Sequence, residues 1–464
     1  MAQQTKLGLA RRVRHLLGID RAIGFTVLAR SWTILSGALT LLLISRFLSV
    51  TEQGYYYTFS SLVQIQVVFE LGFSFVILQL AAHEISILKV EPSGDLAGDP
   101  IAHSRLASIL QKSVRWYSVA AALMGLVLLF AGSHFFSAHA ASSVSWKIPW
   151  VCIVCAAVLT FQMDPIFSFL EGCGFVAQVA RMRFTQAISG TVLAWLLLTQ
   201  HRGLFAPAAV ISGQAAAGFV FLLSKRGFLL PLLRRKCGTD IVGWHTEIWP
   251  FQWRMALSFF CSYLIFPLFN PVLFAYRGAS EAGRMGMSLT IATSLGTVAY
   301  AWINTKASPF GAMIARRDFG TLDRVFFRTL CQSGALLLAG DGIVLCGIFG
   351  VERRLPQLIQ RMLPLPILAL LMLAVFLNHL LYSEALYLRA HKREPFLLLS
   401  IVVALICCAN TLVSGRWWGA TGVTVGYLIC GGMINLAGGT YVFMRSRRIW
   451  HSSPHDLEGL AERI

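Results

Sequence analysis

The sequence predicts an all-α polytopic membrane protein of about twelve transmembrane helices in two six-helix bundles. Hydrophobic residues make up 56% of the 464-residue chain and charged residues only 13%, with a mean hydropathy of +0.67. Soluble domains of this size are far less apolar. Apolar segments recur, and each spanning helix needs roughly 20 such residues. About twelve spans would therefore leave room for short loops and two tails, and none for a soluble domain.

The apolar segments set the expected order of spans. The first twenty residues are basic and contain no small-residue cleavage site after a short apolar core, so we expect no removable signal peptide and a retained first span. We expect transmembrane helices near residues 25–47, 55–80, 117–136, 148–170, 184–200, 204–223, 255–276, 285–305, 328–350, 364–388, 396–414 and 417–444.

The distribution of basic residues predicts the orientation. With both ends inside, and with Arg46 and Arg328 at span ends counted with the loops they adjoin, the inner segments hold 29 of the 39 Lys and Arg residues and the outer loops hold nine. Arg30 is then the one basic residue left within a span. Because basic residues collect in cytoplasmic loops, both termini are expected to be cytoplasmic in a bacterial inner membrane. The net charge of +18 is explained by this bias, and no nucleic-acid partner is expected.

Two long inner segments, residues 83–115 and 224–254, mix charged with apolar residues. Such a composition favours interfacial helices that lie along the membrane. The second segment divides the chain near its middle, whereas all outer loops are too short to fold into a domain.

A weak internal repeat supports two halves. Thr51-Glu52-Gln53-Gly54 precedes the second span, and Ser280-Glu281-Ala282-Gly283 precedes the eighth, at an offset of 229 residues. We therefore predict an N-terminal half, residues 1–235, with a basic amphipathic tail, and a C-terminal half, residues 236–464, with a basic tail. Repeated bundles of this kind are how many transporters achieve alternating access.

Cysteine usage points to no cofactor. All ten cysteines fall in predicted spans or inner loops, where disulfides are not expected. Cys152 and Cys155 have metal-like spacing but lie in an apolar span without a second pair or a histidine nearby, so we expect neither a metal site nor a cofactor.

Short motifs in the first two spans carry a resemblance to a known family. They are Leu28-Ala29-Arg30-Ser31, then Ser45-Arg46-Phe47-Leu48-Ser49-Val50-Thr51-Glu52-Gln53-Gly54-Tyr55-Tyr56, then Glu70-Leu71-Gly72-Phe73. This pattern resembles the Wzx-like polysaccharide flippases of the multidrug/oligosaccharidyl-lipid/polysaccharide (MOP) exporter superfamily. The segment Leu386-Tyr387-Leu388-Arg389-Ala390-His391-Lys392-Arg393 is similar to the family's inner loop after helix ten. The turn in the second half departs from the family because no tyrosine follows Gly283.

Arg30 is the first candidate for substrate binding. A charge at bilayer depth costs about 2.5–3.5 kcal/mol on insertion scales, so a buried cation needs a reason to be there. The resemblance implies that this arginine faces a central cavity and meets the pyrophosphate of a lipid-linked sugar. The alternatives are a structural ion pair and a side chain that reaches the inner interface. Glu70, near Gln64 in the second span, could pair with Arg30 or act as a proton-sensitive gate.

Further polar residues in the spans are candidates for the cavity or for coupling to an ion. Asp164 precedes Pro165, and Asp341 lies between two glycines. Each acid marks either a helix break that binds a cation or a kink whose polar groups are satisfied within the protein and bind no ligand. His379 and Glu384 are further gating candidates, with a structural hydrogen bond as the alternative. Asn270, Asn304 and Asn378 are candidates to touch substrate, although asparagines between helices commonly serve packing.

Three classes of function remain open. The first is a flippase that moves a polyprenyl-pyrophosphate-linked oligosaccharide between leaflets, with membrane lipids and polysaccharide-assembly proteins as its other partners. The second is a cation-coupled small-molecule or drug antiporter of the same superfamily, which would need acids more than bases in its cavity. The third is a membrane glycosyltransferase or polysaccharide polymerase, which the short first outer loop with Glu52 as its one acid disfavours. No catalytic residue is therefore predicted.

Overall fold

The computed structural model describes residues 21–90, 96–139, 144–235, 263–351, 356–391 and 395–451, with a few isolated positions between 236 and 262. The chain divides into two compact units. Unit 1 comprises Met1–Glu52 and Leu62–Phe259, and unit 2 comprises Gln53–Ser61 and Phe260–Ile464. The predicted tails and most of residues 236–262 lie outside the described residues, so the predicted division at residue 235 stays a prediction.

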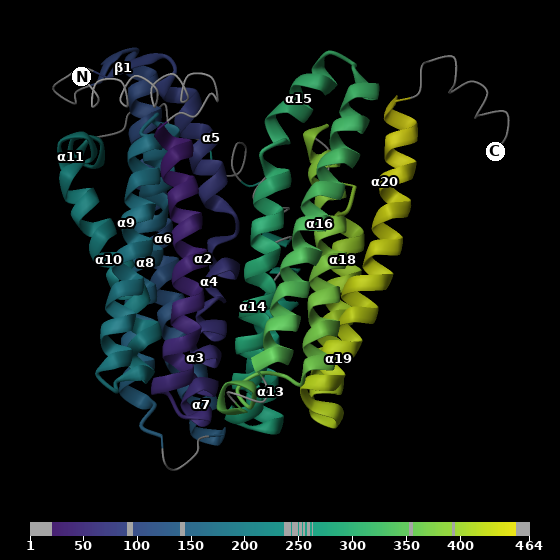
Figure 1. The fold of residues 1–464 in the computed structure, drawn as a ribbon. Coiled ribbons are helices and arrows are strands. Elements are labelled where there is room, and N and C mark those ends of the chain that lie inside the picture. Colours follow the sequence, from purple (N-terminus) through teal and green to yellow (C-terminus); the bar gives the residue numbers. More distant parts are fainter. Residues whose placement is uncertain are drawn as a thin grey trace, which may run out of the picture. The chain divides into compact units, whose positions relative to one another are not determined.

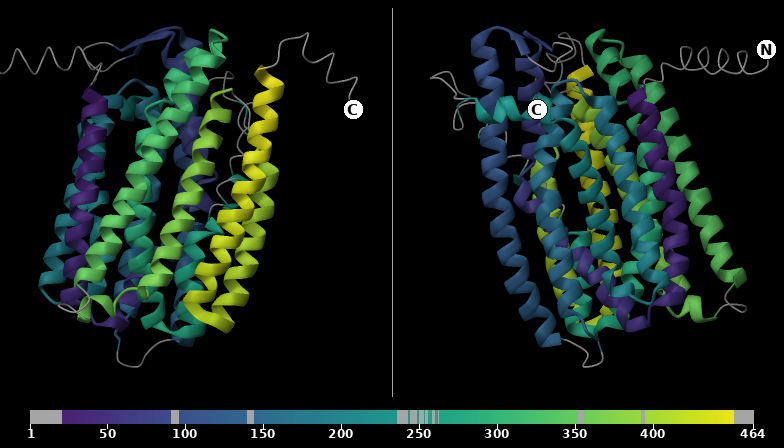
Figure 2. Two further views of the ribbon diagram at one scale, coloured as in Figure 1. Left: turned by 45° about the vertical axis from the view of Figure 1, so that its right-hand side comes forward. Right: turned by 90° about the vertical axis from the view of Figure 1, so that its left-hand side faces the viewer.

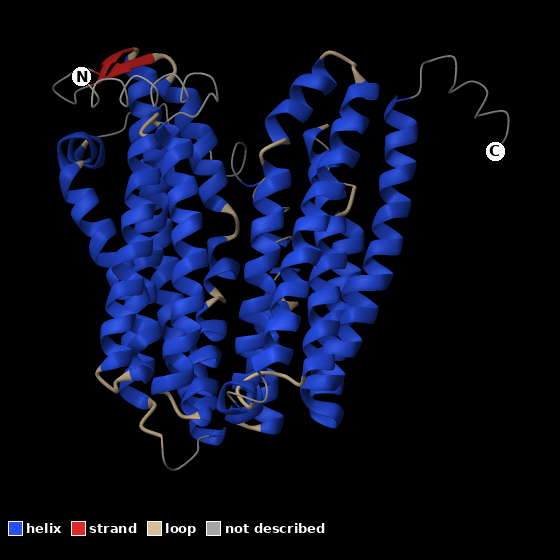
Figure 3. Ribbon diagram, viewed as in Figure 1, coloured by secondary structure: helices blue, strands red, loops and turns tan. Residues whose placement is uncertain are grey.

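Unit 1 is a bundle of helices with one short β-hairpin, drawn in red in Figure 3. Strands β1 (Leu88–Val90) and β2 (Leu96–Gly98) pair antiparallel. The helical elements are α2 (Arg21–Phe47), α3 (Val50–Val63, shared with unit 2), α4 (Gln66–Glu70), α5 (Phe73–Ile85), α6 (Pro100–Val127), the π-helical η1 (Leu128–Gly132), α7 (Ser133–His139), α8 (Lys147–Gly172), α9 (Val176–Thr199), η2 (Gly203–Phe205), α10 (Ala206–Ser224) and α11 (Arg226–Arg234).

Unit 2 is helical throughout its described residues, and its helices lie lengthwise beside one another (Figures 1 and 2). An aromatic core of Phe310, Phe326, Tyr387 and Phe443 joins four of them. The elements are η4 (Phe266–Leu268), α13 (Phe269–Arg277), α14 (Ala279–Asn304), α15 (Ala307–Ala315), α16 (Phe319–Val351), α17 (Pro356–Ile359), α18 (Leu365–Ala390), α19 (Leu397–Tyr427), η5 (Leu428–Ile434) and α20 (Asn435–His451).

The helices confirm an all-α polytopic membrane protein. Seven helices in the described residues are long and apolar enough to cross a membrane, or eight if the bent α3–α5 segment is one span. Each of the twelve predicted spans overlaps a described helix, but α9 and α14 fall short of this apolarity test. Both helices carry charges near one end, such as Arg183 in α9 and Arg284 in α14. The span predicted near 255–276 is represented among the described elements only by η4 and the nine-residue α13.

The apolar stretch Leu397–His451 contains two spans rather than one. A single helix of 55 residues would be about 80 Å long, far more than a bilayer needs. The chain instead reverses at Gly419, whose φ of 63° is a left-handed conformation that favours glycine. A Cβ on Gly426 would meet Asn410, and one on Gly438 would meet Leu399, as expected for antiparallel neighbours. The two predicted spans 396–414 and 417–444 are the arms of this hairpin.

Large apolar side chains are exposed along the outer faces of both units. Phe130 is 74% exposed, Leu35 72%, Ile343 73% and Leu398 74%. Soluble monomers rarely expose extended apolar surface, because water penalises it. Lipid chains are the solvent that such faces require.

The prediction of interfacial helices in residues 83–115 is wrong. The segment contains the β1–β2 hairpin, and from Pro100 onward it is the extension of a predicted span into the long helix α6. Asp99 caps this helix, since its carboxylate accepts hydrogen bonds from the backbone N–H groups of Ile101 (3.1 Å) and Ala102 (3.4 Å). In the second inner segment, α11 is a short helix with buried Phe228, Leu229 and Leu232.

The two copies of the repeated motif meet within unit 2. The Gln53 side chain donates from Nε2 to the carbonyl of Gly283 at 2.9 Å. A Cβ on Gly54 would lie 1.9 Å from the carbonyl oxygen of Ala279, and one on Gly283 would lie 2.9 Å from the Gly54 nitrogen. Only glycines permit this approach of α3 to α14. The repeat therefore marks a backbone contact between helices.

The acids of the two motifs cap helices. Glu52 accepts from the Ser49 backbone N–H at 2.8 Å, and Ser49 Oγ accepts from the Glu52 N–H at 3.1 Å, forming a capping box before α3. Glu281 accepts from the Ala420 backbone N–H at 2.6 Å, just after the reversal at Gly419. Both carboxylates thus accept hydrogen bonds from backbone N–H groups at helix starts, which is a structural role.

Candidate functional site

Arg30 lies on α2, about 14 Å along the helix from Arg21. Its side chain is exposed, and it forms no ion pair within the part of the chain that the structure describes. Trp32 donates from Nε1 to Thr191 of α9 at 3.4 Å, so that side of α2 faces the bundle. Two residues along an α-helix correspond to a rotation of about 200° about its axis, which is the same as about 160° in the other direction. The Arg30 side chain therefore points nearly opposite to that of Trp32. Arg30 is thus a cation on the face of α2 that is not packed against α9.

Glu70 ends α4 at a break in the second span. Leu71 and Gly72 follow with φ values of 53° and 67°, and the helix axis bends by 44° before α5 continues. The predicted pair with Arg30 is not formed among the described residues. The carboxylate of Glu70 instead interacts electrostatically with Asp164 of α8 and with Tyr117 of α6. Gln64 is exposed in the turn after α3.

Asp164 lies beside a proline-induced weak point in α8. Pro165 is buried inside the helix and cannot donate the backbone hydrogen bond to residue 161. Arg183 of α9 acts electrostatically on Asp164 and also pairs with Glu171 at 3.3 Å. The Glu70 and Asp164 carboxylates thus repel each other electrostatically, and Arg183 offsets this repulsion at Asp164.

The acids and the histidine of unit 2 are each enclosed by helices. Asp341 of α16 is 7% exposed, and its Oδ1 has no hydrogen-bond partner. His379 of α18 is fully buried, with Nε2 2.8 Å from Ser333 Oγ. Glu384 accepts from Thr440 Oγ1 at 2.8 Å, while its Oε2 has no partner. A hydrogen bond to a neighbouring helix thus accounts only in part for His379, whose Nδ1 has no partner, and for Glu384, while Asp341 keeps an unsatisfied oxygen.

A cavity of about 320 Å³ lies within unit 2, and Asn378, one of the predicted substrate-binding asparagines, lines it. Asn378 donates from Nδ2 to the hydroxyl of Tyr427 at 2.6 Å, and both residues line the cavity. Asn304 lies close by and accepts from the Tyr382 hydroxyl at 2.9 Å. The lining has hydroxyl, amide and guanidinium groups and no carboxylate: Ile265, Phe266, Tyr300, Asn378, Leu381, Tyr382, Ala385, Arg389, Phe396, Leu399, Ser400, Tyr427 and Asn435.

Asn270 does not reach this cavity. It is 4% exposed on α13 and donates from Nδ2 to Ser61 Oγ at 2.9 Å, which ties α13 to α3. This contact has the character of polar packing between membrane helices. Within the described residues, no three His, Cys, Asp or Glu side chains are placed to hold a metal ion.

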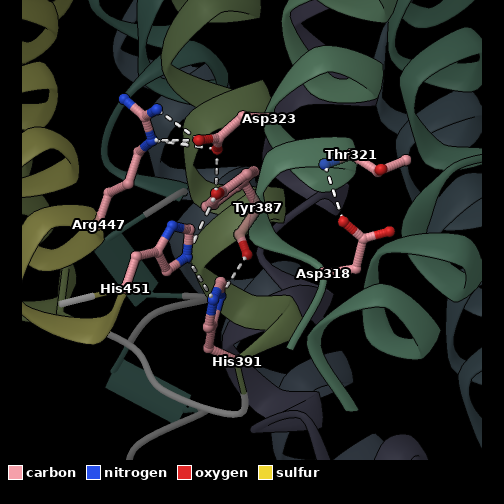
Figure 4. Close-up of polar contacts among 7 residues, drawn as sticks. All are labelled: Asp318, Thr321, Asp323, Tyr387, His391, Arg447 and His451. Carbon is pink, nitrogen blue, oxygen red and sulfur yellow. Dashed lines mark hydrogen bonds and ion pairs between the residues drawn. The ribbon is translucent and has the colours of Figure 1, made fainter. Parts of the chain in front are cut away.

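Sequence reasoning missed a polar cluster that joins α16, α18 and α20 (Figure 4). Arg447 donates from Nε to both carboxylate oxygens of Asp323, at 3.0 and 3.1 Å, and Tyr387 donates to Oδ1 at 2.6 Å. His391 Nε2 lies 3.3 Å from His451 Nε2. The sequence did contain a signal that α16 begins before residue 328. Asp318 caps the helix by accepting from the Thr321 N–H at 3.1 Å, and Asp323 therefore lies within α16.

The fold matches solved transporters. A search of protein families and a search of curated proteins find no match. An inward-facing multidrug resistance MATE transporter of the MOP superfamily aligns over 90% of this chain and 99% of its own, with a TM-score of 0.60 and 13% identity. The lipid II flippase MurJ in an inward closed conformation aligns over 91% and 87%, at the same TM-score and identity. The MATE multidrug transporter DinF-BH aligns over 93% and 97%, with a TM-score of 0.60 and 13% identity. The protein therefore has the fold of these MATE transporters and of MurJ.

Proposed function

We propose that the protein is a flippase that moves a lipid-linked oligosaccharide across a bacterial cytoplasmic membrane by alternating access. The cavity without carboxylates in unit 2 carries this proposal. Tyrosine and asparagine side chains suit a hydroxyl-rich headgroup, and an arginine suits an anion, whereas a cationic drug would need acids there. Arg30, in unit 1, is a separate cation that would replace the hydration of a pyrophosphate.

The mechanism follows from the physics of the substrate. A charged, hydroxyl-rich headgroup cannot cross hydrocarbon unaided, but its lipid tail can remain in the bilayer. We propose that the halves 1–235 and 236–464 rock about the headgroup, with both termini cytoplasmic. The structural likeness to MurJ, a lipid II flippase, supports this class of substrate over an enzymatic role.

Reconstitution tests the proposal directly. Purified protein in liposomes should move a fluorescent polyprenyl-pyrophosphate oligosaccharide between leaflets, measured as protection from or exposure to a membrane-impermeant quencher. Liposomes without protein set the background. Uptake of a cationic dye such as ethidium by the same liposomes, without movement of the lipid-linked sugar, would assign the protein to the antiporters instead.

One observation keeps an ion-coupled antiporter as a second candidate. Glu70 and Asp164 are neighbouring acids at a break in a membrane helix, an arrangement that suits a group that binds and releases a proton. The same pair would serve equally well as the proton-coupling site of a flippase. It therefore bears on whether protons drive transport and not on which substrate is transported.

We expect Glu70→Gln and Asp164→Asn each to abolish transport driven by a pH gradient while leaving exchange without a gradient intact. Each change removes one of two mutually repelling carboxylates, so thermal stability should stay the same or rise. Asp99→Asn is the matched control, since this exposed acid caps α6 in the same unit, asparagine caps a helix equally well, and the coupling should be unaltered. Equal loss of driven transport and exchange would show that the pair does not couple transport to protons.

A further inference from the structure

A basic pocket lies between α9 and α10 in unit 1. It measures about 430 Å³, and its lining consists of Gln178, Arg181, Met182, Thr185, Ala217, Val220, Phe221, Ser224 and Lys225. On α9 the polar members follow the helical spacing i, i+3 and i+7 at residues 178, 181 and 185. The matching face of α10 runs through residues 217, 220 and 224. Two neighbouring helices thus build one site.

The two cations of this pocket lack a carboxylate partner. Neither Arg181 nor Lys225 forms an ion pair within the described residues, and no acid lines the pocket. Lys225 lies over the ring of Phe175 at 4.6 Å from its centroid, which fixes the ammonium group at the pocket. Burial lowers the pKa of Lys225, as expected for a cation without a compensating anion.

The surroundings of the pocket are those of a membrane interface. On α10, Phe219, Val220 and Leu223 are 54%, 66% and 49% exposed, an apolar surface directly beside the cations. The chain then turns into α11, which buries Phe228, Leu229 and Leu232 and carries Arg226 and Arg234 at its ends. Gln111 of α6 holds the end of α11 by donating to the carbonyl of Leu232 at 2.9 Å. An amphipathic helix so placed suits the boundary between headgroups and acyl chains.

We propose that Arg181 and Lys225 bind the phosphate of an anionic phospholipid, whose acyl chains lie along the exposed apolar face of α10. Arginine offers a planar pair of donors to a phosphate, and lysine adds a point charge. Basic pockets between membrane helices are suited to anionic headgroups. This lipid is bound and not transported, so the site is independent of the proposed cargo.

Lipid binding by the full-length protein tests the site. Protein purified in detergent is titrated with phosphatidylglycerol, with phosphatidylcholine of the same chains, and with inorganic phosphate, and bound lipid is counted by native mass spectrometry. We expect phosphatidylglycerol to bind in preference to phosphatidylcholine. The double variant Arg181→Gln, Lys225→Gln should bind it about 30-fold more weakly, because each basic residue near the membrane surface contributes about fivefold.

Two further variants separate the site from general charge and from folding. Lys147→Gln with Arg202→Gln removes two exposed cations at the opposite end of the same bundle and should bind phosphatidylglycerol like wild type. Thr185→Glu keeps both cations but places a carboxylate four residues from Arg181, a spacing that stabilises a helix while neutralising the pocket. It should lose the lipid without losing thermal stability. Equal binding of phosphatidylcholine, equal loss in the control pair, or competition by free phosphate alone would overturn the proposal.

Discussion

Replacing Arg30 with alanine is expected to reduce translocation of a lipid-linked oligosaccharide about ten- to a hundredfold. A hydrogen bond to a charged group contributes about 1.5–3 kcal/mol, and that contribution is lost with the guanidinium. Folding should be unaffected, because Arg30 is exposed and makes no ion pair among the described residues. Transport in liposomes and a thermal melt of the same preparation measure the two effects separately.

Two variants serve as controls for this change. Arg30→Lys keeps the charge but not the planar pair of donors, so its transport should fall between wild type and alanine. Arg46→Ala removes an exposed arginine from the other end of α2 and should transport normally. Normal transport by Arg30→Ala would remove Arg30 from the substrate path, and a loss of thermal stability would assign it a structural role.

Replacing Gly54 with alanine is expected to cause a large loss of stability for the addition of one methyl group. Its Cβ would lie 1.9 Å from the carbonyl oxygen of Ala279, closer than any real contact, so α3 and α14 would have to separate. Overpacking typically costs about 1–3 kcal/mol when side chains can move, and a backbone clash leaves less room to adjust. We expect little monodisperse protein after extraction and a clearly lower melting temperature.

Gly37→Ala is the control for this change. A Cβ on Gly37 would have no atom within 4 Å, and alanine favours a helix over glycine by roughly 1 kcal/mol. Its stability should therefore match or exceed that of wild type. A Gly54→Ala protein that melted like wild type would show that α3 and α14 lie further apart than this contact requires.

The chain's local chemistry was sufficient to predict most of the long apolar helices. Inside a bilayer each backbone group must be satisfied within its own segment, so a span is a local property of about 20 apolar residues. The hairpin at Gly419 was predicted as two spans for this reason. Helix ends beyond the apolar runs were missed, although Asp99 before Pro100 and Asp318 before Phe319 are ordinary capping signals.

The tertiary structure alone decided which polar residues meet. Glu70 lies near Asp164 and not in an ion pair with Arg30, and Glu281 caps the backbone at Ala420, 139 residues away. Gly54 and Gly283 were visible as a repeat, but their backbone contact was not. Such pairings depend on how each helix is rotated against its neighbours, and the packing of many side chains sets that rotation. Hydropathy along one segment therefore determines that a helix crosses the membrane, and the neighbouring helices determine what each of its faces meets.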